Sequence, residues 1–153
     1  SRGRQVGRNM QNHSVETLVV GMLVTEATQT ETSAAEELIT AWLAAGGTME
    51  SLGADKGYHT GGFVEFLRGL EIGPHIAQIA GRRTPGLDRR TTRHKGYRMS
   101  QVRRKLVEEV FGWGKVIGGI RKSRFIGRIK TSMTTLITSA AYNLLRMTRL
   151  AAA

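Results

Sequence analysis

Apolar residues along the chain recur in two spacings, which together predict an α/β fold. A compact run rich in β-branched residues at 17–25 predicts a strand buried on both faces. Shorter runs predict strands at 50–54 and 74–80, and residues 7–11 are compatible with a strand or an extended lead-in. The strand at 50–54 ends at Asp55.

Helical spacing predicts two short helices between and beside these strands. The first, at 33–45, is rich in Ala, Glu and Leu and stops at Gly46-Gly47. The second, at 62–70, can be capped by Thr60. Its core-facing residues are expected to be Phe63, Phe66, Leu67 and Leu70.

Two longer helices are predicted in the last third, at 100–117 with Ser100 as a cap and at 130–150. At 100° per residue, the apolar face of the first is formed by Val102, Leu106, Val110, Trp113 and Ile117. Its opposite face carries Gln101, Arg104, Glu108 and Lys115. In the second helix, seven residues recur at helical spacing and are expected to lie in the core or to pack against another helix: Met133, Ile137, Ala140, Ala141, Leu144, Leu145 and Thr148.

The order strand, helix, strand, helix, strand, then helices indicates an α/β domain. The helix after Asp55 predicts a crossover connection, so the strands near residues 50 and 76 are expected to be parallel. Ligands of such sheets bind at the carboxyl ends of strands, where Asp55 stands. We treat residues 1–153 as a single domain.

The charge of the chain is concentrated in one region. The net charge is +11, but residues 81–130 contain 16 Lys or Arg against three acids, whereas residues 1–80 contain five against nine. The loop at 81–98 is especially basic, and Pro85-Gly86 makes regular structure unexpected there. A concentrated basic surface is typical of nucleic-acid binding, although a solubilising basic run is the simpler alternative.

Several function classes find no support in the sequence. There is no cysteine, and the histidines (13, 59, 75 and 94) have no metal-ligand spacing, so neither disulfides nor a zinc site is expected. No apolar run is long enough to cross a membrane and no signal peptide is visible, so a cytoplasmic location is expected. The first residue is Ser1 rather than methionine, consistent with a piece of a longer protein.

Two carboxylates are candidates for chemistry. Asp55, one of only two aspartates, follows a strand, where it could bind Mg²⁺ or simply cap a turn. Glu108 lies between Arg104 and Lys115 on one helix face, an arrangement that also fits ordinary surface ion pairs. Asp88, between arginines, is expected to be a local charge partner.

Four motifs stand out along the chain: Gly-Ala-Asp-Lys-Gly-Tyr at 53–58, Thr-Thr-Arg-His-Lys-Gly-Tyr at 91–97, Val-Glu-Glu-Val-Phe-Gly-Trp at 107–113, and Ala-Ala-Tyr-Asn-Leu-Leu-Arg-Met at 140–147. In this order and spacing they resemble the carboxyl-terminal part of bacterial insertion-sequence transposases of the DDE type. The resemblance runs from about residue 12 onward. It implies a ribonuclease-H-like fold, here incomplete, with a small mixed sheet, flanking helices and a long carboxyl-terminal helix.

The resemblance also implies site residues. The family's second aspartate carries over to Asp55, and its Tyr-x2-Arg-x3-Glu-x6-Lys signature carries over to Arg104, Glu108 and Lys115, with Gln101 in place of the tyrosine. Asp55 and Glu108 would bind Mg²⁺ or Mn²⁺. The residues expected to hold DNA phosphates are Arg104, Lys115, Lys56, Arg90, Arg93, His94 and Lys95.

The family's first aspartate has no counterpart, because no aspartate precedes Asp55. The first, central strand of the fold is therefore expected to be missing, with residues 17–25 as the family's third strand. The main hypothesis is DNA transposition, meaning cleavage and strand transfer at insertion-sequence ends, as part of a larger, homodimeric, nucleoid-associated enzyme, with this chain inactive alone. The alternatives are a non-catalytic DNA-binding remnant and a structural basic protein that contacts RNA.

Overall fold

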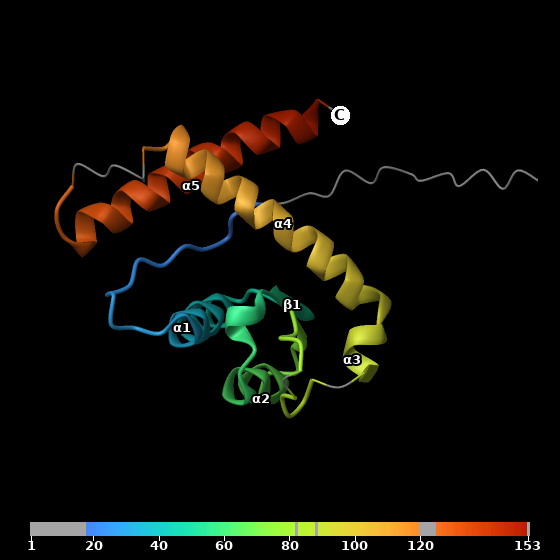
Figure 1. Ribbon diagram of the computed structural model, residues 1–153. Coiled ribbons are helices and arrows are strands. Elements are labelled where there is room, and N and C mark those ends of the chain that lie inside the picture. Colours follow the sequence, from blue (N-terminus) through green and yellow to red (C-terminus); the bar gives the residue numbers. More distant parts are fainter. Residues whose placement is uncertain (1–17, 82, 88, 120–124, 153) are drawn as a thin grey trace, which may run out of the picture.

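The computed structural model describes residues 18–81, 83–87, 89–119 and 125–152. Their elements, in chain order, are α1 (Glu31–Ala44), β1 (Ser51–Ala54), the 3-10 turn η1 (Lys56–Tyr58), α2 (Gly61–Gly69), β2 (Gly73–Ile76), α3 (Arg89–Arg93), α4 (Lys95–Val116) and α5 (Arg128–Ala151). The two strands lie with α1 and α2 in the lower part of the molecule, and α4 runs obliquely from them to α5 (Figure 1).

The strands form a two-stranded sheet whose register pairs Ser51 with Gly73 and Ala54 with Ile76. They are parallel, which confirms the crossover expected from the helix between them. β2 is shorter than predicted because its partner ends at Ala54, whose carbonyl accepts the last ladder bond from Ala77 N–H at 2.9 Å. The sheet and α2 supply most of the core, which consists of Ile39, Ala54, Phe63, Val64, Leu67, Ile72, Ile76 and Leu87.

Capping threonines set where the two short helices begin. The Thr30 hydroxyl accepts a hydrogen bond from Ser33 N–H at 3.2 Å, so α1 begins two residues earlier than predicted. The Thr60 hydroxyl accepts from Phe63 N–H at 3.4 Å and begins α2 as expected. Leu70 does not join the core: it follows the last residue of α2 and is 39% exposed.

The strand predicted at 17–25 is wrong over its described part, residues 18–25, which form no regular element. A strand needs a neighbour for its backbone, and here a side chain takes that place. Val19 N–H donates to Asn143 Oδ1 at 2.8 Å, and Asn143 Nδ2 donates to the Val19 carbonyl at 2.7 Å. Residue 17 and the possible strand at 7–11 lie outside the described residues.

The basic loop is more regular than predicted. It contains the short helix α3, and α4 begins at Lys95 rather than at Ser100. The cap of α4 is His94, whose Nδ1 accepts from Gly96 N–H at 3.2 Å. A histidine can serve as an N-cap because its neutral ring carries an acceptor nitrogen, a role that sequence patterns rarely assign to it.

The apolar face of α5 does not enter the core, which corrects the sequence-based expectation. Its seven predicted core residues are all exposed, among them Ile137 and Leu144 at 65% each. The buried residues of α5 are instead Thr135, Thr138, Ser139 and Tyr142.

Small residues explain which face of α5 is packed. Gly114 and Gly118 stand where α4 ends, and a Cβ at Gly118 would overlap the Cγ2 methyl of Thr138. The two helices therefore approach closely through glycine and threonine. Beside this contact the rings of Trp113 and Tyr142 meet edge to face, with 5.5 Å between their centroids.

Candidate active site and nucleic-acid interface

Asp55 directly follows β1 and caps the turn η1. Its Oδ1 accepts a hydrogen bond from Gly57 N–H at 2.7 Å, and the side chain is exposed, as is that of Lys56. Asp55 therefore caps a turn, which is one of the two roles expected for it from the sequence. The cap occupies one of two carboxylate oxygens on an exposed side chain, so capping and ligand binding are compatible at this residue.

A second carboxylate, which sequence analysis missed, lies beside Asp55. A Cβ built on Gly57 would be 3.0 Å from Asp55 Oδ1 and 3.3 Å from Glu31 Oε2, so both carboxylates converge on the same side of Gly57. Burial raises the pKa of Tyr58, and the charges of Glu31 and Asp55 raise it further. Only the tertiary contact of α1 with η1 brings Glu31 here, so no local sequence signal could have found it.

The first turns of α4 are fastened to the carboxyl end of β2. The Tyr97 hydroxyl donates to the Ile76 carbonyl at 3.0 Å, and Gln101 Nε2 donates to the His75 carbonyl at 2.5 Å. The Ser100 hydroxyl and His75 Nδ1 are 2.7 Å apart. Tyr97 and Gln101 are four residues apart and therefore share a helix face, so spacing alone could have suggested this pairing.

Glu108 lies on the same face of α4, two turns beyond Gln101, or about 10 Å along the axis. Its side chain is exposed, as is that of Lys115 in the last turn. Arg104 is partly buried, and its Nε is buried with no hydrogen-bond partner. The residues of α4 that contact the end of the sheet are thus Tyr97, Ser100 and Gln101. The pairing of Asp55 with Glu108 in one site remains a prediction.

The described residues contain no group of three or more His, Asp or Glu side chains placed to hold one metal ion. A two-metal site needs several carboxylates close together. The described part of the chain therefore does not fit such a site by itself.

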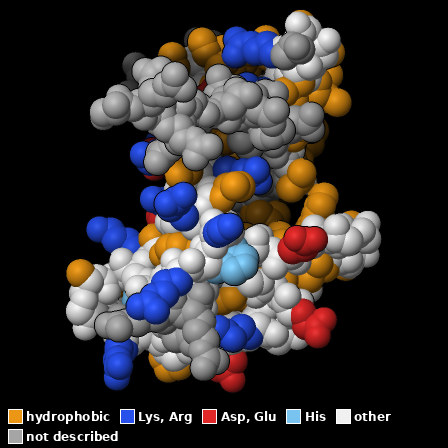
Figure 2. All heavy atoms as spheres, turned by 90° about the vertical axis from the view of Figure 1, so that its right-hand side faces the viewer, with side chains coloured by type: hydrophobic (Ala, Val, Ile, Leu, Met, Phe, Trp, Pro, Cys, Tyr) orange, Lys and Arg blue, Asp and Glu red, His pale blue; other side chains and the backbone are white. Residues whose placement is uncertain are grey.

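Four of the seven residues predicted to hold DNA phosphates, Arg90, Arg93, His94 and Lys95, lie at or just before the start of α4. Arg93, His94 and Lys95 are exposed there, whereas the side chain of Arg90 lies outside what the structure describes. The face that carries α3 and the start of α4 shows Lys and Arg side chains spread from top to bottom, with acidic side chains toward one edge (Figure 2). This distribution gives a nucleic-acid backbone several possible points of contact.

A histidine pair lies within this basic face. The rings of His75 and His94 are 6.3 Å apart between centroids, and the ring of Tyr97 lies 5.9 Å from His75. Burial lowers the pKa of His75, and the charge of His94 lowers it further. His75 therefore favours its neutral form, which can hydrogen-bond to Ser100.

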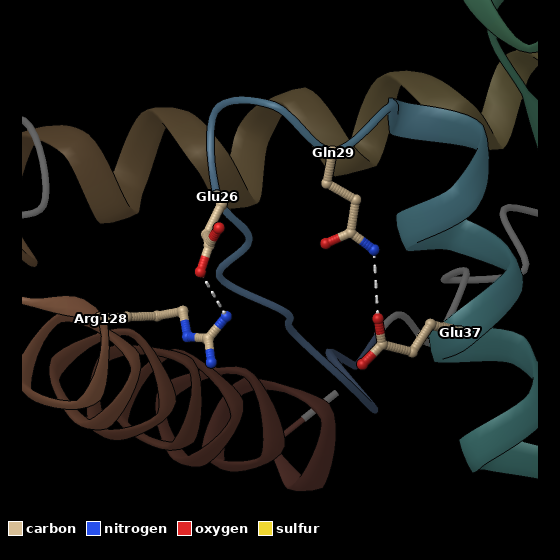
Figure 3. A network of polar contacts seen from close by, with 4 residues as sticks. All are labelled: Glu26, Gln29, Glu37 and Arg128. Atoms are coloured by element: carbon tan, nitrogen blue, oxygen red, sulfur yellow. Dashed lines mark hydrogen bonds and ion pairs between the residues drawn. The ribbon is translucent and has the colours of Figure 1, made fainter.

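A pocket of about 400 Å³ lies elsewhere, between the segment preceding α1 and the start of α5, with Leu23 and Met133 among its lining residues. Its polar lining includes Gln29, Glu37 and Arg128. Gln29 donates to Glu37 at 3.2 Å, and Arg128 forms an ion pair with Glu26 at 3.2 Å (Figure 3). None of the predicted site residues lines this pocket. Among the described helices, none has the length and apolar character needed to cross a membrane.

The second half of the chain is similar to a known protein family. Residues 73–148, from β2 to near the end of α5, match the family model of the transposase DDE domain. The match supports a fragment of a DDE-type transposase, and the two-stranded α/β arrangement of the described residues is compatible with part of a ribonuclease-H-like domain. No curated protein and no solved structure matches the chain.

Proposed function

We propose that this chain is part of the catalytic domain of a transposase that cuts DNA at the ends of an insertion sequence and joins the 3′ hydroxyl to target DNA. The observation that carries the proposal is the family match over residues 73–148, which includes Glu108 and the positively charged region at residues 81–130. DNA is the partner, met in the cytoplasm at the nucleoid, and the intact enzyme acts as a homodimer.

In this proposal Asp55 and Glu108 are two of the carboxylates that bind Mg²⁺ or Mn²⁺, which would stabilise the charge of the phosphodiester exchange when bound. The described residues do not gather a third ligand, so we derive no chemical step through the metal. Arg104 and Lys115 would hold a phosphate along α4. Lys56, Arg93, His94 and Lys95, with Arg90, would follow the DNA backbone.

DNA binding can be tested separately from catalysis. The chain should bind duplex DNA with an affinity that falls steeply with salt, because each phosphate contact contributes about 0.9 to the slope of log K against log salt. The triple variant R93Q/K95Q/K115Q should lower that slope by up to about 2.7. R149Q is the matched control, because Arg149 is an exposed cation at the end of α5 and lies outside residues 81–130; this variant should leave the slope nearly unchanged. Equal slopes for the triple variant and the wild type would contradict the proposed interface.

Catalysis is tested by strand transfer with Mg²⁺ or Mn²⁺. The chain alone should show none, because no aspartate precedes Asp55 to complete the carboxylate set. Robust strand transfer by these 153 residues would refute that reasoning. The pairing itself is tested by the variant D55C/E108C: the chain has no other cysteine, so a short bifunctional maleimide should link the two positions within one molecule if they belong to one metal site.

A non-catalytic DNA-binding remnant is the second candidate, favoured by the lack of a three-carboxylate group among the described residues. It predicts binding that is salt-sensitive, indifferent to sequence and unaffected by divalent ions. The double variant D55A/E108A separates the two functions. For a remnant, its affinity should be the same with and without Mg²⁺, as for the wild type, whereas for a metal-binding site only the wild type should respond to the ion.

A further inference from the structure

Three side chains near the start of α4 hold this helix against the sheet. The Tyr97 hydroxyl donates to the Ile76 carbonyl at 3.0 Å, and Gln101 Nε2 donates to the His75 carbonyl at 2.5 Å. The Ser100 hydroxyl lies 2.7 Å from His75 Nδ1. We call these three contacts the α4 clasp. All three join α4 to the carboxyl end of β2.

The same part of α4 also lies close to β1. A Cβ built on Gly53 would be 3.2 Å from Ser100 Cβ and 3.3 Å from the Ser100 carbonyl oxygen, so the absence of a side chain at Gly53 permits this approach. Gly53 stands two residues before Asp55. The start of α4 is therefore packed directly on the strand that leads to Asp55.

The contacts of the clasp lie on both sides of the helix face that carries Arg104 and Glu108. At 100° per residue from Tyr97, Gln101 lies at about +40° and Ser100 at about −60°. Arg104 and Glu108 lie at about −20° and +20°, within this arc. Rotation of the helix in one direction moves Gln101 away from its acceptor, and rotation in the other direction separates Ser100 from β2. The clasp therefore fixes the direction in which Arg104 and Glu108 point.

A small rotation of α4 would displace Glu108 by a distance that matters for chemistry. Beyond the clasp, α4 runs away from the sheet toward α5 (Figure 1), so Glu108 depends on contacts two turns earlier for its direction. Side chains end about 5–6 Å from a helix axis, and a rotation of about 30° therefore moves a carboxylate there by about 3 Å. The two ions of a two-metal site are only about 3.5–4 Å apart. A misplacement of about 1 Å can already slow a reaction about 100-fold.

We propose that Gln101 is a positioning residue, whose bond to the His75 carbonyl sets the rotation of α4 and thereby the placement of Glu108 relative to Asp55. Gln101 stands where the resemblance expects a tyrosine, but it is partly buried and its amide nitrogen binds the sheet. Its role in this chain is therefore to orient the residues that follow it on α4, not to hold a phosphate. The inference rests on the proposed function, because it concerns the same two carboxylates, although the bond itself needs neither DNA nor metal.

Distance measurement by pulsed electron paramagnetic resonance (EPR) on the whole chain tests this. The chain has no cysteine, so E65C/E109C accepts two spin labels, one on the exposed side of α2 and one on α4 beside Glu108. With Gln101 present, the labels should give one narrow distance distribution. Adding Q101M, which keeps the side-chain length but removes the donor, should shift or broaden it by about 3 Å. K105M, at an exposed position of α4 outside the clasp, is the matched control and should change nothing.

The variant Q101E separates the hydrogen bond from the shape of the side chain. An ionised carboxylate cannot donate to the His75 carbonyl, whereas a protonated carboxyl can. Because a glutamate ordinarily has a pKa of about 4.3, Q101E should behave like Q101M at pH 7.5 and return toward the narrow distribution at pH 4. The protein with Gln101 and the Q101M variant, measured at both pH values, show what acid changes by itself.

Equal distributions with Gln101 and with Q101M, or no recovery of Q101E at pH 4, would overturn the proposal. Circular dichroism should show the same helix content for Q101M and K105M, so that a shift reports rotation and not loss of helix. The proposed function is tested separately on the unlabelled chain, by Mn²⁺ binding followed through the EPR signal of the free ion. Absence of Mn²⁺ binding would contradict the paired carboxylates, while a shift in Q101M would still assign the rotation of α4 to Gln101.

Discussion

Replacement of Gly118 by alanine should destabilise the fold by disturbing the contact between α4 and α5. The added methyl group would overlap the Cγ2 methyl of Thr138 and lie 2.8 Å from the Gly114 carbonyl oxygen. Both neighbours are held in place, Gly114 because it is buried within α4 and Thr138 because it is buried on α5. The helices must therefore move apart to accept the methyl group.

The expected loss in the free energy of unfolding combines two opposing effects. Overpacking of a close contact costs about 1–3 kcal/mol. Alanine restricts the unfolded chain more than glycine does, which returns about 0.4–1 kcal/mol. The net loss should be about 1–2 kcal/mol, measured by urea unfolding. G118A/T138S, which removes the obstructing methyl, should recover about 1 kcal/mol of it relative to G118A alone.

Gly112 provides the control for this experiment. It lies within α4, is exposed, and a Cβ there would have nothing within 4 Å. G112A should therefore stabilise the protein by about 0.5–1 kcal/mol through helix propensity alone. If G118A were as stable as the wild type, or if both variants changed stability in the same direction, the close approach of α4 and α5 would be refuted.

Three further outcomes follow from individual contacts. Y97F should cost about 1 kcal/mol, because the Ile76 carbonyl loses its hydroxyl donor, and urea unfolding should show this while DNA affinity stays unchanged. The lowered pKa of His75 means that the unfolded state binds more protons below about pH 6.5, so the free energy of unfolding should fall from pH 7.5 to 5.5, and less steeply in H75N. A steeper fall in H75N would contradict this sign. N143L should release the backbone of Val19, and limited proteolysis should then cleave within residues 18–25 faster than in the wild type.

The parts of the fold that the sequence predicts well are those set by local interactions. Thr30 and Thr60 cap their helices through bonds to residues three positions on, and these offsets can be read directly from the chain. The parallel pairing of β1 and β2 follows from the helix between them. His94 shows the limit of such reasoning, because its capping nitrogen is rarely used in this way.

Features that depend on partners distant in sequence were not predictable. Residues 17–25 have strand composition, but composition cannot supply a neighbouring strand, and Asn143 bonds to the backbone instead. Hydrophobic periodicity found the apolar face of α5, yet Gly114 and Gly118 decide that the opposite face is packed. At the candidate site, the position of Asp55 after β1 was foreseeable, whereas its neighbour Glu31 comes from a different helix.

The double hydrogen bond between Asn143 and Val19 joins positions separated by 124 residues, which constrains how the chain can fold as it is synthesised. At translation speeds of about 5–20 residues per second, the segment around Val19 waits on the order of 6–25 seconds before Asn143 is even made. During that time Val19 and its apolar neighbours have no partner on α5. A chaperone that holds extended apolar segments would find its binding site here, and demand for it should grow when translation is slowed.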